Sequence, residues 1–214
     1  MRNRFDEQLL KLNKAIIEMG AMCEEAITNT SKALIEGDLK LASEVIEDSN
    51  DIDHLEHDIE TQCMKLLLHQ QPVAKDLRLI SAVLKMITDM ERIGDQAEDI
   101  AEIIIYLNDD RGIDLALIKE MADATIKMVT LSIDSFIKKD ESLAHDVIRQ
   151  DDIVDDYFIR IKSALIKLIK DNAIDGEYAL DLLMISKYYE RIGDHATNIA
   201  EWVIYSITGI HKEE

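Results

Sequence analysis

The pentapeptide Glu-Arg-Ile-Gly-Asp stands at Glu91–Asp95 and again at Glu190–Asp194, 190 − 91 = 99 residues later. The chain has 214 residues, so this offset is close to half of its length. The repeat continues downstream at the same offset, in the pairs Ala97/Ala196, Ile100/Ile199, Ala101/Ala200, Glu102/Glu201, Ile105/Ile204 and Tyr106/Tyr205. We therefore expect one unit built twice. Because a repeated core requires only apolar character, identical charged residues indicate a role for those charges in each half.

The composition is typical of long helices. Hydrophobic residues make up 47% of the chain, aromatic residues only 5%, and there are seven glycines and a single proline, Pro72. Isoleucine, aspartate, leucine, glutamate, alanine and lysine are the most frequent residues, and leucine, glutamate, alanine and lysine are strong helix formers. No segment of any length shows the alternation of a strand.

The formal net charge is −20 and the sequence pI is about 4.6. Such a surface repels nucleic acid, which requires a basic footprint, and it would also repel an anionic lipid leaflet. It attracts divalent cations and the basic faces of partner proteins. We expect no nucleic-acid partner, and contact with a membrane only through protein partners.

Cys23 and Cys63 lie in apolar helical context without a Cys-x-x-Cys motif, as buried free thiols of a cytosolic protein do. The first residues lead into a mixed-charge segment that does not resemble a signal peptide. No stretch approaches the roughly 20 apolar residues of a membrane span. The sequence therefore predicts a cytoplasmic protein.

Breaks in the apolar pattern divide the chain into six helices. Gly37-Asp38 and Lys139-Asp140 each combine a stop with a following N-cap, Gln70–Pro72 and Asp171–Gly176 form turns, and Asn108–Gly112 is the polar connection between the halves. The predicted helices cover residues 5–35, 39–69, 74–107, 114–138, 141–170 and 177–207. Short connections imply antiparallel neighbours. The prediction is an all-α fold of two pseudo-symmetric antiparallel three-helix bundles, in residues 1–110 and 111–214.

A stripe of carboxylates follows the repeated pentapeptide. At 100° per residue, Glu91, Asp95, Glu98, Asp99 and Glu102 fall within about 100° of one helix face. The second copy keeps Glu190, Asp194 and Glu201 there, with Asn198 in place of Asp99 and Thr197 in place of Glu98. Gly94 and Gly193 lie inside these helices, which indicates close approach of another segment or of a ligand.

The hairpin around Pro72 brings a second set of carboxylates to the same height. Asp53 precedes the turn by 72 − 53 = 19 residues and Glu91 follows it by 91 − 72 = 19. This register places Glu47, Asp48, Asp51 and Asp53 beside Glu91 and Asp95, and it places Asp151, Asp152 and Asp155 beside Glu190 and Asp194. Carboxylates from adjacent helices would thus converge once in each half.

Two interpretations of these clusters remain open. A divalent or trivalent cation relieves the repulsion within an unpaired carboxylate cluster, and all-oxygen ligands suit Mg²⁺, Ca²⁺, Mn²⁺ or iron, while His195 would admit iron or zinc. Alternatively, the stripe is a solvated or partner-facing acidic surface, with Arg92 and Arg191 paired to Asp95 and Asp194. The spacing alone does not separate the two.

At this point the residues resemble the PhoU family in order and spacing. The resemblance is carried by Val45-Ile46-Glu47, by Gln71–Arg78 (Gln-Pro-Val-Ala-Lys-Asp-Leu-Arg), by Asp89–Asp95 and by Tyr189–Ile199. It extends over essentially the whole chain. It implies two three-helix bundles related by pseudo-symmetry.

The resemblance also implies a function. Family members are accessory and negative regulatory proteins of phosphate uptake and of the phosphate-starvation response. They act with the ATPase of the phosphate ABC transporter and with a phosphate-sensing histidine kinase, and a homodimer is expected. The family motif Glu/Asp-x-x-x-Asp is associated with multinuclear metal sites, often of iron, and it maps here onto Glu91/Asp95 and Glu190/Asp194.

The first half departs from the family pattern. The second helix of each repeat commonly carries Asp-x-x-Val/Ile-Asp/Asn, which is Asp151, Val154 and Asp155 in the second half, whereas Ser49 occupies the leading position ahead of Ile52 and Asp53 in the first. The expected metal ligands are Asp151, Asp155, Glu190, Asp194 and Asn198 in the second site and Asp53, Glu91, Asp95 and Asp99 in the first. We expect the second site to be the stronger, because basic residues near it are too few to neutralise it.

Two alternatives were weighed against this function. A di-metal carboxylate enzyme of the ferritin type uses Glu-x-x-His motifs, and the six histidines give no such doubled motif. There is also no Gly-rich phosphate loop or nucleophile–base motif, so we expect no catalytic residues and no enzyme. The other alternative is a PhoU-like accessory of a different phosphate carrier.

Overall fold

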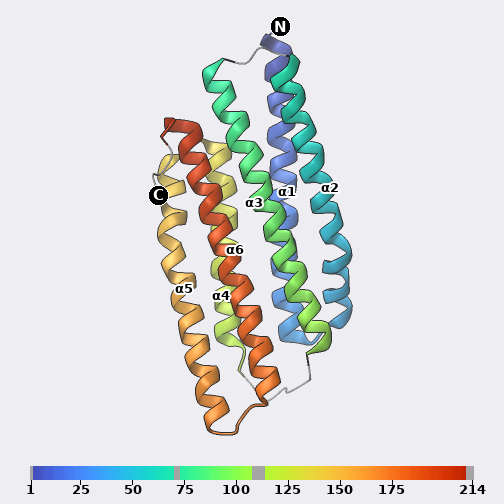
Figure 1. Cartoon of the computed structure of the whole chain (residues 1–214), viewed down its shortest axis with the longest axis vertical. Helices are drawn as coiled ribbons and strands as arrows, with labels where there is room; N and C mark the ends of the chain where they lie inside the picture. Colours follow the sequence, from blue (N-terminus) through green and yellow to red (C-terminus); the bar gives the residue numbers. More distant parts are fainter. Residues whose placement is uncertain (1, 70–72, 108–113, 211–214) are drawn as a thin grey trace.

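The fold consists of six long helices (Figure 1), and this computed structural model describes residues 2–69, 73–107 and 114–210. The helices are α1 (Arg2–Glu36), α2 (Leu39–His69), α3 (Ala74–Tyr106), α4 (Ala116–Lys138), α5 (Glu141–Lys170) and α6 (Gly176–Thr208). The described residues contain no strand. The predicted all-α fold is confirmed. The expected breaks at Gln70–Pro72 and at Asn108–Gly112 lie outside the described residues.

Aspartates at the helix starts and left-handed residues at the helix ends produce the short turns. Asp38, Asp140 and Asp175 each accept hydrogen bonds from two backbone N–H groups of the helix that follows, at 2.9–3.3 Å. Gly37, with φ of +68°, ends α1, and Lys139, with φ of 52°, ends α4. Equivalent turns in the two halves therefore have equivalent geometry, although only the first uses glycine.

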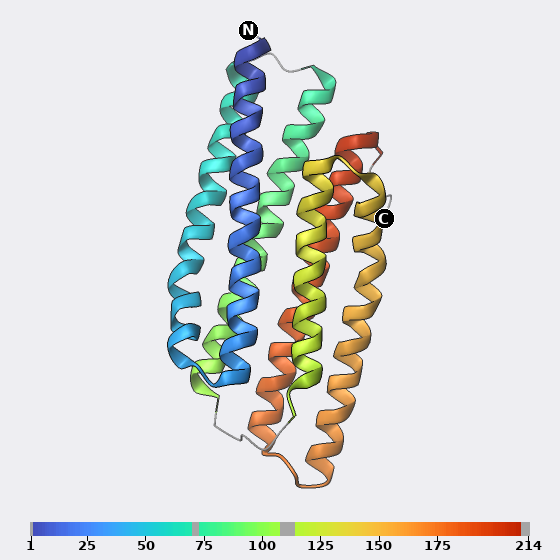
Figure 2. The ribbon, with the colours of Figure 1, turned by 180° about the vertical axis from the view of Figure 1, so that it is seen from behind.

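Each half is a three-helix bundle, and the bundles meet along two pairs of helices. Helices α1, α2 and α3 pack against one another, as do α4, α5 and α6. Between the bundles α3 packs against α6 and α1 against α4, so that α3 and α6 lie on one side of the molecule and α1 and α4 on the other (Figures 1 and 2). We call the contact between α3 and α6 the seam. The two helices that carry Glu-Arg-Ile-Gly-Asp are therefore neighbours.

The core is continuous through both bundles. Ile93, Ala97, Ile100 and Ile104 of α3 are buried, and so are their α6 counterparts Ile192, Ala196, Ile199 and Val203. Tyr189 is fully buried, and its hydroxyl shares a hydrogen bond of 3.0 Å with the Thr30 hydroxyl of the other bundle. Burial of this apolar surface supplies the main stabilisation of the fold. None of the described helices combines the length and the apolar character that a membrane span requires.

Both cysteines are buried free thiols, as the sequence predicts. Burial raises the pKa of Cys23 and of Cys63 to about 12, and the Cys23 thiol donates to the Met90 carbonyl oxygen at 3.4 Å. Such thiols pack as small apolar groups, since only the thiolate is reactive.

The two repeat glycines face different neighbours. A Cβ at Gly94 would lie 3.0 Å from Cδ1 and 3.2 Å from Cγ2 of Ile52, whereas a Cβ at Gly193 would meet Val154 Cγ1 at 3.5 Å and Asp151 Oδ1 at 3.6 Å. The expected close approach is therefore that of α2 at Gly94, and at Gly193 there is room for a methyl group.

We predict opposite effects for alanine at these two positions. Gly193→Ala gains helix propensity without a clash and should raise the free energy of unfolding by about 0.5–1 kcal/mol. Gly94→Ala gains the same propensity but displaces Ile52 in a packed core, and should lower it by about 1 kcal/mol. Urea unfolding of the two variants measures both values. Stabilisation of equal size in both would contradict the close approach at Gly94.

Candidate metal site: two carboxylate clusters

The first cluster lies between α2 and α3. Asp53 and Glu56 of α2 face Glu91 and Asp95 of α3 closely enough for the charges to affect one another. The register predicted from the hairpin is therefore confirmed for Asp53, Glu91 and Asp95. The sequence analysis missed Glu56, although it follows Asp53 by three residues and so shares its helix face.

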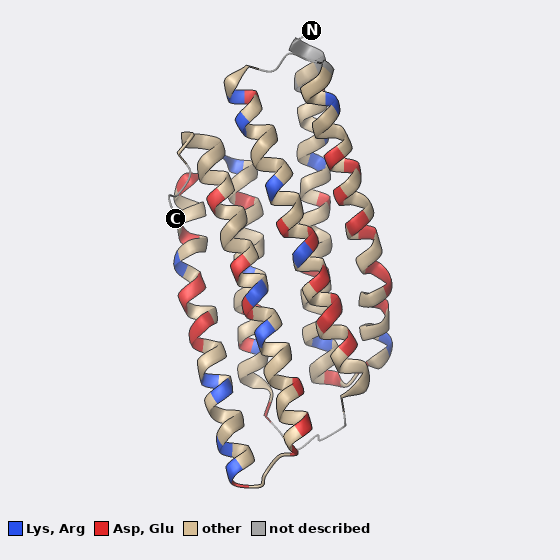
Figure 3. Cartoon of the chain, viewed as in Figure 1, with Lys and Arg blue, Asp and Glu red and all other residues tan. Residues whose placement is uncertain are grey.

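The second cluster lies between α5 and α6, at the equivalent place in the other bundle. Asp151 and Asp155 of α5 face Glu190 and Asp194 of α6. The residues that correspond to Asp53, Glu91 and Asp95 are Asp155, Glu190 and Asp194. The structure thus brings together all four carboxylates predicted for this half. Figure 3 shows acidic residues along α2, α3, α5 and α6.

Partial burial and mutual repulsion raise the pKa of most of these carboxyl groups. The largest rise is at Asp151, where burial and the charges of Asp194 and Asp155 raise the pKa to about 6. Burial and neighbouring carboxylates likewise raise the pKa of Asp155, Asp194, Asp53 and Glu91. The second cluster therefore contains the carboxylate that is most destabilised as an anion.

Each cluster contains one paired cation. Arg92 Nη1 lies 2.9 Å from Asp95 Oδ2, as one of the two interpretations proposed. In the second cluster Lys187 pairs with Glu190 and lies over the Phe158 ring. Burial and the charge of Glu190 raise the pKa of Asp155 and Asp194, and the charge of Lys187 partly offsets this rise. The prediction that too few basic residues lie near this cluster did not take Lys187 into account. Among the described ion pairs none joins Arg191 to Asp194.

Two predicted ligands face the seam. Asn198 Nδ2 donates to Asp89 Oδ1 at 3.1 Å, and His195 Nδ1 lies 2.9 Å from the same oxygen. Asp99, the counterpart of Asn198, is hydrogen-bonded by Tyr188, the counterpart of Asp89, although burial and Glu102 raise its pKa overall. The two contacts are thus related by the pseudo-symmetry. They join α3 to α6, and the sequence analysis did not anticipate them.

Other first-half candidates face away from the first cluster. Ser49 is buried, and its hydroxyl donates to the Ile46 carbonyl oxygen at 2.9 Å. Asp48 and Asp51, which the hairpin register placed beside Glu91 and Asp95, instead line a cavity of about 240 Å³ between α1 and α2 with Glu25 and Asn29. Among the described residues of the first half, no carboxylate therefore takes the position of Asp151.

The carboxylate oxygens of the clusters suit a hard cation, but their side chains are not arranged to enclose one. Among the described residues no three carboxylate, imidazole or thiolate groups are arranged to hold a single metal ion. The buried Thr197 hydroxyl lies beside Asp151, and its interaction with that carboxylate lowers the Asp151 pKa against the larger rise from burial. Mutually repelling, partly buried carboxylates are consistent with a cation or ordered water in the second cluster. Ion binding would require the exposed carboxylates to turn inward.

Comparisons with known proteins agree with the doubled unit. The sequence model of the PhoU domain matches residues 16–104 and again residues 118–203. The chain belongs to the PhoU family. The match covers both bundles of the family member described here and includes both carboxylate clusters.

Curated relatives match over nearly the whole chain. A "Phosphate-specific transport system accessory protein PhoU homolog" from Clostridium acetobutylicum is 35% identical over 97% of this chain and 96% of its own length. A homologue from Thermotoga maritima is 32% identical over 98% of this chain and 91% of its own. The crystal structure of PhoU from Pseudomonas aeruginosa covers 96% of this chain with 32% identity and a TM-score of 0.91.

The raised pKa of Asp151 predicts a pH dependence of stability in metal-free protein. The group is neutral in both states below about pH 4; between pH 4 and its folded pKa of about 6, only the unfolded chain releases the proton. Stability should therefore fall as the pH rises from 4 to 6. The loss should be about 1 kcal/mol, since the group is partly solvated.

Asp151→Asn should remove this loss and stabilise metal-free protein at pH 7. Chemical unfolding in EDTA at pH 4 and pH 7 measures the difference, and Asp156→Asn, a substitution at an exposed position paired with Arg160, should retain the dependence of the parent. Equal pH dependence in the parent and Asp151→Asn would contradict the assignment.

Proposed function

We propose that this chain is an accessory protein of a phosphate-specific transport system and a negative regulator of the phosphate-starvation response. The observation that carries the proposal is the match of both bundles to PhoU domains, together with relatives named as accessory proteins of that system. The function is a protein-interaction function without catalysis. The partners are the ATPase of the phosphate transporter and a phosphate-sensing histidine kinase, and the protein acts as a homodimer in the cytoplasm.

Deletion of the gene should cause expression of phosphate-starvation genes in phosphate-rich medium. The physical reason is that the kinase then loses the protein that couples it to the transporter. A reporter fused to a phosphate-starvation promoter measures the effect, and the wild-type gene in trans should restore repression. Normal repression after a clean deletion, in a strain without a second PhoU gene, would instead favour an accessory of a different phosphate carrier.

We further propose that the carboxylate clusters bind metal ions, with iron the first candidate and zinc, manganese or magnesium possible. Asp151, Asp155, Glu190 and Asp194 would hold the ion in the second cluster, and Asp53, Glu91 and Asp95 in the first, with Glu56 as an added ligand. The raised pKa values support this proposal, because bound positive charge would offset both the burial and the repulsion that raise them. Asp99 and Asn198 face the seam and would contribute only after rearrangement.

Metal content in two variants tests this proposal. Asp194→Ala should lose the more tightly bound metal, because the second cluster has Asp151 where the first has Ser49. Asp95→Ala should lose the weaker. Elemental analysis of protein purified without a metal-affinity tag measures both, and Asp156→Ala, at an exposed site paired with Arg160, is the control.

Melting temperature separates an occupied cluster from an empty one. Removal of a carboxylate from an occupied cluster should lower both the metal content and the melting temperature, since ligand binding stabilises the folded state. Removal from an empty cluster relieves repulsion and should raise the melting temperature. Two stabilised variants of a parent without metal would show that the clusters are acidic surfaces.

A further inference from the structure

The charge of this chain is distributed unevenly between the two bundles. The last turns of α2 and the first turns of α3, residues 61–69 and 73–85, carry Lys65, Lys75, Arg78 and Lys85 against Asp76, a net charge of 4 − 1 = +3. The equivalent residues 163–184 of the second bundle carry two lysines against four acidic residues, a net charge of 2 − 4 = −2. We call the first region, together with Lys11 and Lys14 of α1, the basic pole.

Apolar side chains protrude from the same pole. Leu68 is 73% exposed, Leu10 63%, Val73 62%, Met64 46% and Leu77 45%. Met64, Lys65 and Leu68 share one stripe of α2, because they are one and four residues apart. The basic pole therefore combines exposed cations with protruding aliphatic groups. The last turns of α5 also carry cations and exposed isoleucines, but they adjoin acidic residues at the start of α6.

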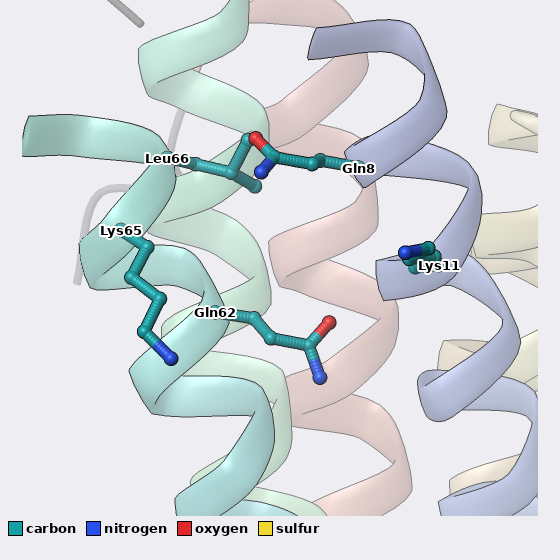
Figure 4. Close-up of a pocket in the computed structure, with 5 residues that line it drawn as sticks. All are labelled: Gln8, Lys11, Gln62, Lys65 and Leu66. Carbon is teal, nitrogen blue, oxygen red and sulfur yellow. The ribbon is translucent and has the colours of Figure 1, made fainter. Parts of the chain in front are cut away.

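A cavity of about 230 Å³ opens on this pole between α1 and α2. Its lining is Gln8, Lys11, Gln62, Lys65 and Leu66 (Figure 4), with no carboxylate among these residues. The Gln8 Oε1 atom is buried and has no hydrogen-bond partner. In Figure 4 the Gln8 and Gln62 side chains point from facing helices toward the space between them. Two ammonium groups and two amides at one cavity fit a phosphate ester that also carries hydroxyl donors.

We propose that the basic pole docks on the surface of an anionic phospholipid membrane, with lipid phosphates near Lys11 and Lys65 and with Leu68 and Val73 inserted between headgroups. Exposed aliphatic groups among cations are the composition of interfacial membrane-binding surfaces. Each cation near such a surface favours binding roughly five-fold. This inference does not depend on the proposed regulatory function.

The net charge of −20 does not prevent this docking, contrary to the expectation from composition. The first cluster begins at Asp53, 68 − 53 = 15 residues from Leu68, which is about 22 Å along the helix. Glu60, on the same helix, lies about 12 Å from Leu68 along the axis. Since the screening length at physiological ionic strength is about 8 Å, the acidic remainder acts weakly at the pole.

The position of the pole favours a membrane over a protein partner. The first bundle projects past the second at this end, and the pole is an extremity of the long axis (Figures 1 and 2). Leu68 lies in the last turn of α2 and Val73 directly precedes α3, so both exposed side chains lie at this extremity. Apolar groups at the extremity of an elongated molecule can reach a planar headgroup layer without a matching groove.

Sedimentation with vesicles tests the proposal. The full chain should bind vesicles of equal parts phosphatidylglycerol and phosphatidylcholine at low ionic strength, bind more weakly at high ionic strength, and leave pure phosphatidylcholine unbound. The double variant Lys65→Glu/Lys75→Glu should reduce the partition coefficient roughly twenty-five-fold or more. Leu68→Ser/Val73→Ser should reduce it roughly ten-fold.

The second bundle provides the matched control. Lys167 is the counterpart of Lys65, since 65 + 102 = 167, and Lys167 and Lys170 are both exposed. Lys167→Glu/Lys170→Glu changes the net charge by the same amount as the test variant, and should change binding less than two-fold. Equal losses in the two charge variants, equal binding to both vesicle types, or no binding to anionic vesicles would overturn the proposal and leave the pole as a protein-binding surface.

Discussion

The contact between α3 and α6 fixes the position of both carboxylate clusters. Each of these helices buries one face in the continuous core, and their polar contacts across the seam, Asp89 with Asn198 and Tyr188 with Asp99, are related by the pseudo-symmetry. Because one face of each helix is buried in the core and another packs across the seam, Glu91 and Glu190 can face only the second helix of their own bundle. The carboxylates of α2 and α5 meet them there because the hairpin turns set the register. The clusters are thus a consequence of how the core is packed.

This arrangement concentrates repulsion where the fold can tolerate it. The clusters lie at the surface, where water screens like charges, and the apolar core beneath them contributes far more free energy than a few partly solvated carboxylates remove. Asp151 is affected most, because burial and the charges of Asp194 and Asp155 together raise its pKa to about 6. A group kept in this state in the folded protein is poised to gain from a bound cation. The second cluster is for that reason the more responsive of the two.

The sequence predicted the elements better than it predicted which neighbour each side chain meets. The boundaries of 39–69 and 141–170 agree with α2 and α5, because Asp38 and Asp140 cap the starts and the chain must turn at the ends. A helical projection places Asp99 on the acidic stripe, but it cannot show that Tyr188 of another bundle lies opposite. Glu56 and Lys187 could have been found from the sequence, because each lies three residues from a predicted ligand on its own helix, Asp53 and Glu190.

The two halves share a backbone and differ in what they present to solvent. Asp151 corresponds to the buried Ser49, and Glu56 corresponds to Phe158, so the two clusters do not offer the same ligands. Ile166 corresponds to Met64, and both are exposed, but the cations next to Ile166, Lys167 and Lys170, adjoin the acidic start of α6. A duplicated unit keeps its core because packing constrains it, while its surface is free to diverge. The second half thus carries the stronger candidate cation site, well inside α5 and α6, and the first carries the basic pole, where α2 ends and α3 begins. Binding at one location can therefore occur without steric interference from the other.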